Sequence, residues 1–170
     1  MINRTLVSTL LLFLLASPAA AQQTIFLIRH AERADGGSNS PTAVPDPDLS
    51  DAGLARAASL ATVLEDAGIT AIFATEYKRT QQTAAPLAKA LGLPVINLKS
   101  TDTAALLAQL KAAKGPALVV GHSNTIPVVA KALGIASPPK VGEDEYDKLF
   151  ILTTASSAAG PPSLLTLHYR

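Results

Sequence analysis

Three short apolar runs alternate with helix-like segments along this chain, and this alternation restricts its fold more than any other feature. The runs are TIFLI at 24–28, ITAIFA at 69–74 and PALVV at 116–120. They are continuous in apolar character, as strands buried on both faces of a parallel sheet are. The segments between them repeat apolar residues at helical spacing. The pattern therefore predicts an α/β fold in which helices cover a mostly parallel sheet.

The remaining segments complete this prediction. Helices are expected over 51–66, 80–91, 102–114 and 124–133, and further strands over 93–98, 149–153 and 164–168, the last two as an antiparallel pair. Ser50 is the expected cap of the first helix, and Ser123 or Asn124 that of the last. Pro86 either kinks its helix or marks a late start.

The first 21 residues are expected to be a signal peptide and not part of the fold. Arg4 gives a positive start, an apolar run covers 6–16, and three alanines at 19–21 offer a small-x-small cleavage site. The run is shorter than the roughly 20 residues that span a bilayer, so an uncleaved anchor is the weaker alternative. We therefore expect one exported domain over 22–170, most simply in a periplasm, without stable membrane insertion after cleavage.

The composition excludes several classes of partner and site. The chain has 14 basic and 13 acidic side chains, and loss of Arg4 with the leader makes the two signs equal. No broad basic field then remains for nucleic acid or an anionic membrane. The chain has no cysteine, which excludes disulfides and thiolate metal sites. The composition leaves open whether the protein is a monomer or a dimer.

Cationic residues follow each of the three apolar runs. Arg29 and His30 follow the first, Arg79 follows the second, and His122 follows the third. Ligands of open α/β sheets bind beyond the carboxyl ends of the strands, so we expect these side chains at one rim. Guanidinium groups bind phosphate oxygens bidentately. One histidine can attack phosphorus while the other donates to the non-bridging oxygens, and Ser123 is a further candidate phosphate contact.

The motifs LIRHAER, EYKRTQQTA and VVGHSNT, in this order, resemble the histidine phosphatase superfamily, which includes cofactor-dependent phosphoglycerate mutases and acid phosphatases. The family's Arg-His-Gly appears here with Ala31 in place of glycine. Its Ser-x-x-x-Arg-Thr/Ala-x-Gln-Thr pattern is matched by Thr75, Arg79, Thr80, Gln82 and Thr83, and the similarity extends over 24–153.

This resemblance implies a phosphoglycerate mutase-like three-layer sandwich and names the site residues. His30 would be the transiently phosphorylated nucleophile, and Arg29, Arg79 and His122 would complete the catalytic phosphate pocket. It implies no metal and no other cofactor, because the arginines supply the countercharge. A zinc site is the competing use of two histidines, but no His-x-x-x-His or adjoining carboxylate pattern supports it.

The sequence offers several candidates for the acid that donates a proton to the leaving group. The family's mutase branch takes it from an acidic residue after the second arginine, where Asp102 is the one candidate before residue 115. The simplest role of Asp102 is to cap the next helix. Glu32 and Glu76 lie near the rim and are further candidates. The acid-phosphatase branch has an aspartate directly after its second histidine, where this chain has Ser123.

The expected function is that of a phosphatase, a phosphoric monoester hydrolase that acts through a phosphohistidine intermediate. Its substrate would be a phosphorylated small molecule or a phosphohistidine, whose imidazole leaving group is expelled without a strong acid. Two alternatives remain. One is a catalytically weak or inactive phosphate-binding or interaction module, and the other is a phosphoglycerate mutase-type phosphotransferase. Against the second, no basic cluster beyond Arg33, Lys78 and Lys140 is present to hold a bisphosphate.

Overall fold

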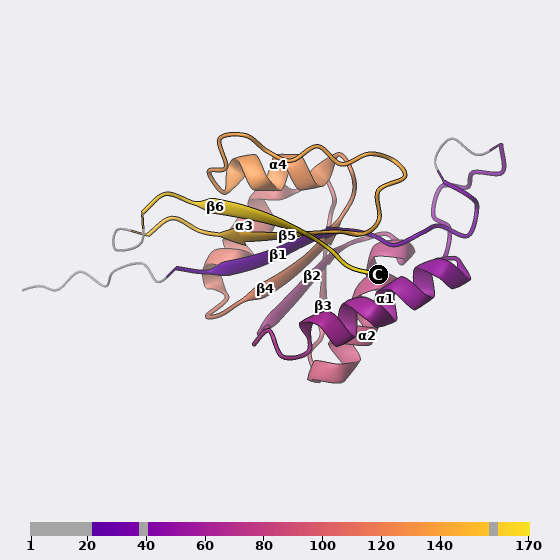
Figure 1. Cartoon of the computed structure of the whole chain (residues 1–170), viewed down its shortest axis with the longest axis horizontal. Coiled ribbons are helices and arrows are strands. Elements are labelled where there is room, and N and C mark those ends of the chain that lie inside the picture. The colour runs from indigo at the N-terminus through magenta and orange to yellow at the C-terminus, as the bar shows by residue number, and fades with distance from the viewer. Residues whose placement is uncertain (1–21, 38–40, 157–159) are drawn as a thin grey trace, which may run out of the picture.

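The computed structural model describes residues 22–37, 41–156 and 160–170 (Figure 1). The signal peptide predicted over 1–21 lies outside these described residues. None of the helices in the described part of the chain is long and apolar enough to cross a membrane.

The described residues form one six-stranded sheet with the strand order β3-β2-β4-β1-β5-β6. Strands β1 (Thr24–Arg29), β2 (Ala71–Thr75), β3 (Val95–Leu98) and β4 (Ala117–Gly121) are mutually parallel. Strands β5 (Lys148–Thr153) and β6 (Ser163–His168) form an antiparallel hairpin that pairs with β1. The mostly parallel sheet and the antiparallel closing pair are both confirmed.

Helices cover both faces of this sheet, which gives the three layers of the predicted sandwich (Figure 1). Helices α1 (Asp51–Leu64) and α2 (Lys78–Leu91) bury Leu60, Leu64 and Leu87 against one face. Helices α3 (Thr103–Ala112) and α4 (Thr125–Ala132) bury Leu110 and Ile126 against the other. The central strands β1 and β4 lie between the two cores, which explains why their sequences are apolar without alternation.

Two helix starts differ from the sequence prediction. Helix α2 begins at Lys78 and continues through Pro86, because the buried Ala84, Leu87 and Ala88 hold its following turn against the sheet. Neither Ser123 nor Asn124 caps α4 through its side chain. Asn124 occupies the N-cap position without a side-chain hydrogen bond, and the hydroxyl of Thr125 instead ties the strand end to the first turn by accepting from the backbone N–H of His122 at 2.8 Å.

Candidate active site

The carboxyl ends of β1, β2 and β4 meet at one edge of the sheet and surround a cavity of about 390 Å³. Arg29, His30, Arg79, His122 and Ser123 all line it. The ring centroids of His30 and His122 lie 5.2 Å apart. The five residues that the three sequence motifs place after separate strands are therefore brought together by the fold.

His30 is held as a neutral imidazole with one ring nitrogen available. Its Nδ1 lies 2.8 Å from the carbonyl oxygen of Ala31. A carbonyl only accepts, so Nδ1 carries the proton and the lone pair is on Nε2. Burial lowers the pKa of His30 to about 3, although the hydrogen bond to Ala31 acts in the opposite direction. At neutral pH the ring is uncharged and Nε2 is a nucleophile.

The two arginines bring fixed positive charge and uncommitted donors to the same cavity. The side chain of Arg29 is 3 % exposed and that of Arg79 is 10 % exposed. Within the described residues, Nε of Arg29 and both Nε and Nη1 of Arg79 are buried without a hydrogen bond. A buried donor without an acceptor costs about 1–3 kcal/mol. An oxyanion bound between the arginines would satisfy such donors, as the phosphate-pocket prediction requires.

His122 is oriented from both sides of its ring. Arg79 Nη2 lies 3.4 Å from Nδ1, and a guanidinium only donates, so Nδ1 accepts and Nε2 carries the proton. Nε2 lies 2.8 Å from Oγ1 of Thr75, which itself lies 3.0 Å from Oγ1 of Thr80. Burial, followed by the positive charge of Arg79, lowers the pKa of His122 to about 4. A bound anion reverses the electrostatic part of this shift, so His122 can take up a proton and donate it to a phosphate oxygen.

Part of the chain, including three of the residues that line the cavity, matches a known protein family. The model of the histidine phosphatase superfamily (branch 1) matches residues 25–102, which include Arg29, His30 and Arg79. These residues belong to the histidine phosphatase superfamily. The match supports a phosphatase or phosphotransferase function for the protein. His122 lies beyond the matched range and joins the site through the fold.

Solved structures of this superfamily share the fold. A mycobacterial glucosyl-3-phosphoglycerate phosphatase aligns with a TM-score of 0.67 and 16% identity, over 88% of this chain and all (100%) of the other. The protein histidine phosphatase SixA, complexed with tungstate, gives 0.65 and 16%, over 86% and 97% of the two chains. A phosphoglycerate mutase from Bacillus anthracis gives 0.65 and 14%, over 86% and 92%. No curated protein matches the sequence. At these identities the likeness establishes the phosphoglycerate mutase-like fold.

Thr83 and Gln82, which belong to the second motif, form hydrogen bonds between α2 and the loop after β1. The backbone N–H of Ala31 donates to Oγ1 of Thr83 at 2.9 Å, and that hydroxyl donates to the carbonyl of Arg79. The side chain of Gln82 accepts from the N–H of Leu49. The two bonds of Thr83 are buried and fix the backbone next to His30 and at Arg79.

Gly121, which precedes His122 in the third motif, is required by close packing. A Cβ atom at this position would lie 2.6 Å from Oγ1 of Thr125. The carbonyl of Gly121 also accepts from the N–H of His30 at 2.9 Å. The glycine thus lets α4 begin directly behind His122 and joins the strand ends that carry the two histidines.

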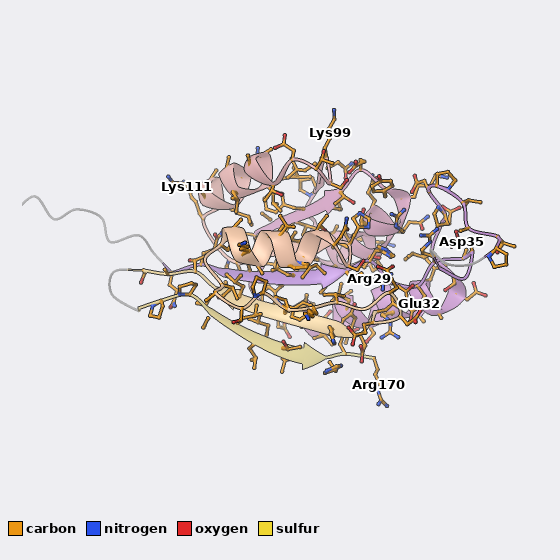
Figure 2. The ribbon with its side chains drawn as sticks, turned by 90° about the horizontal axis from the view of Figure 1, so that it is seen from above. Arg29, Glu32, Asp35, Lys99, Lys111 and Arg170 are labelled. Atoms are coloured by element: carbon orange, nitrogen blue, oxygen red, sulfur yellow. The ribbon has the colours of Figure 1, made fainter. Side chains whose placement is uncertain are left out.

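None of the three acids predicted from the sequence lines the cavity. Glu32 forms an ion pair with Arg56 at 2.7 Å, beside a different hollow. Figure 2 shows Glu32 and Arg29 at the same end of the sheet, so proximity to the rim did not place Glu32 in the site. Asp102 accepts from the N–H of Ala105 at 2.9 Å, which is the capping role.

The carboxylate of Glu76, which does not line the cavity, is hydrogen-bonded to Ser100. Its carboxylate accepts from the backbone N–H of Ser100 at 2.7 Å and from the Ser100 hydroxyl. Burial acts to raise the pKa of Glu76, but hydrogen bonds from backbone N–H groups and from Ser100 outweigh it and lower the pKa. An acid that is ionised in this way is a poor proton donor at neutral pH.

Three residues of the site carry no signal in the sequence. The ring of Tyr77 covers the guanidinium of Arg79 at 4.3 Å, and the ring of Tyr146 covers that of Arg29 at 4.2 Å. Glu143 lines the cavity and pairs with Arg29. Two of the three come from a loop more than a hundred residues after His30, so neither motif spacing nor periodicity could have found them.

Proposed function

We propose that this protein is a phosphatase that hydrolyses a phosphate monoester through a phosphohistidine at His30. The observation that carries the proposal is the neutral, buried imidazole whose Nε2 lone pair serves the cavity that Arg29, Arg79 and His122 also line. This arrangement supplies a nucleophile and positively charged donors without further rearrangement of His30.

The proposed reaction has two displacements at phosphorus. In the first, Nε2 of His30 forms the P–N bond while the P–O bond to the leaving group breaks. Arg29, Arg79 and the protonated His122 stabilise the charge on the non-bridging oxygens. In the second, water attacks phosphorus, the P–N bond breaks, and its electron pair returns to Nε2. The products are the alcohol and inorganic phosphate.

The fold relatives and the size of the cavity indicate the class of substrate. A glucosyl-3-phosphoglycerate phosphatase and the protein histidine phosphatase SixA share the fold, so both a phosphorylated metabolite and a phosphohistidine are candidate substrates. We favour a small phosphate ester, because the cavity of about 390 Å³ suits a compact ligand. We further propose that residues 1–21 direct export and that the domain over 22–170 works in a periplasm.

The deciding experiment is rapid acid-free quenching of the protein with a ³²P-labelled aryl phosphate. We expect label on the wild-type protein and steady release of phosphate, and neither for the His30→Ala variant. Phosphate binding without labelling or turnover on an ester panel would favour the binding-module alternative. Transfer of label to an added sugar or glycerate phosphate, in place of its release as phosphate, would favour the phosphotransferase alternative.

A further inference from the structure

The loop formed by residues 142–147, between α4 and β5, lies over Arg29. The Arg29 guanidinium donates to the carbonyls of Gly142, at 2.8 Å, and of Glu143. Its other terminal nitrogen lies 3.2 Å from Oε2 of Glu143. The ring of Tyr146 covers the guanidinium at 4.2 Å and lies 6.0 Å from the His30 ring. The loop is therefore fixed against the nucleophile's neighbour by several independent contacts.

These contacts place one carboxylate at the mouth of the cavity. Oε1 of Glu143 accepts from the Ser123 hydroxyl at 2.5 Å, and Oε2 pairs with Arg29. The side chain is 47 % exposed, whereas the paired Arg29 side chain is 3 % exposed. Among the residues that the structure describes, Glu143 is the one carboxylate lining the cavity. It thus lies between the buried guanidinium of Arg29 and solvent.

We propose that Glu143 is the proton-transferring carboxylate of this site. The proposal rests on the phosphatase function proposed above. It assigns the proton donor to a residue on the loop before β5, in place of Asp102, Glu32 or Glu76, none of which lines the cavity. Ser123 then acts as a positioning residue, because its hydroxyl orients the carboxylate.

The proton balance closes over the two steps. The ester enters as its monoanion and passes its proton to Glu143, since the phosphate oxygens now share the charge of Arg29. When Nε2 of His30 attacks, the leaving oxygen keeps the electron pair of the broken P–O bond and receives that proton. In the second step Glu143 accepts a proton from the attacking water, and the P–N electron pair returns to Nε2. Glu143 then passes this proton to the departing phosphate, which leaves as its monoanion, and the carboxylate is regenerated. A single carboxylate at the mouth serves both transfers.

The test measures how the loss of activity depends on the leaving group. Glu143→Gln keeps the size of the side chain and one acceptor oxygen for Arg29 or Ser123, but it removes the negative charge and cannot deliver a proton. With alkyl phosphates, whose leaving alkoxide needs protonation, we expect kcat to fall about 10²- to 10⁴-fold. With p-nitrophenyl phosphate, whose leaving group is stable unprotonated, we expect a loss within a few fold. Glu143→Asp retains a carboxylate and should recover part of the alkyl phosphate activity.

Asp144→Asn is the matched control, because Asp144 lies in the same loop, is exposed, and does not line the cavity. It should leave both substrates unaffected. An equal loss on all leaving groups would overturn the proposal and make Glu143 a structural residue. A gain in activity would also overturn it, because the carboxylate would then be an anion that competes with substrate for Arg29.

Failure of the underlying function gives a different result. A wild-type protein that neither acquires label at His30 nor hydrolyses p-nitrophenyl phosphate would contradict the phosphatase itself. Normal labelling of Glu143→Gln by p-nitrophenyl phosphate, together with its loss on alkyl phosphates, supports both inferences at once.

Discussion

The hydroxyl of Thr75 gives the sharpest test of how the fold tunes His122. Oγ1 of Thr75 accepts the Nε2 proton of His122 at 2.8 Å and donates to Oγ1 of Thr80, whose own proton goes to backbone carbonyls. Thr75→Val replaces this acceptor by a methyl group of nearly the same volume. The change therefore removes one hydrogen bond from a buried ring and creates little cavity.

The size of the effect follows from the burial of His122, which is 8% exposed. If the Nε2 proton stays in place without an acceptor, the unpaired N–H costs about 1–3 kcal/mol. The alternative is that the neutral ring carries its proton on Nδ1, where it faces a donor N–H of Arg79. Either outcome misaligns the group that must donate to phosphate. If the whole penalty appears in the transition state, kcat falls about 5- to 150-fold.

The assay measures kcat and KM for p-nitrophenyl phosphate as a function of pH. We expect Thr75→Val to lower kcat more than it changes KM and to move the pH profile, because His122 no longer holds a fixed tautomer. Thr75→Ser keeps the hydroxyl and should restore both. A Thr75→Val protein with wild-type kcat and an unmoved profile would refute the assignment of Thr75 as a positioning residue.

Two predictions concern stability. The pKa values of His30 and His122, about 3 and 4 in the folded state, lie below the ordinary 6.5, so the unfolded chain binds more protons as the pH falls from 6.5. The free energy of unfolding should therefore decrease by about 2 kcal/mol per histidine at about pH 5. In thermal melts, His30→Asn and His122→Asn should flatten this pH dependence. Thr83→Val leaves the buried N–H of Ala31 unpaired and should lower the melting temperature by about 2–10 °C, whereas Thr83→Ser should preserve it. A Thr83→Val melt that overlays the wild type would show that this N–H finds another acceptor.

The sheet was predictable because its signals are local. Strands buried on both faces must be apolar at every position, so β1, β2 and β4 stand out from the sequence alone. Their carboxyl ends carry Arg29-His30, Thr75 and Gly121-His122, and a parallel arrangement forces these ends to one edge. The start of α2 was harder to predict, because the packing of Ala84 and Leu87 outweighs the local effect of Pro86.

The sequence by itself determined the layered α/β fold, the likeness to the histidine phosphatase superfamily and the four charged or titratable groups that converge on the cavity. Only the tertiary structure decided which carboxylate faces that pocket. Asp102, Glu32 and Glu76 lie close to the motifs along the chain, yet none of them lines the cavity. Glu143 lies far along the chain, yet it reaches Arg29 because β5 pairs with β1 and returns the preceding loop to the same edge. The strand that carries the nucleophile and the loop that carries the carboxylate are joined by sheet pairing, which no spacing in the sequence records.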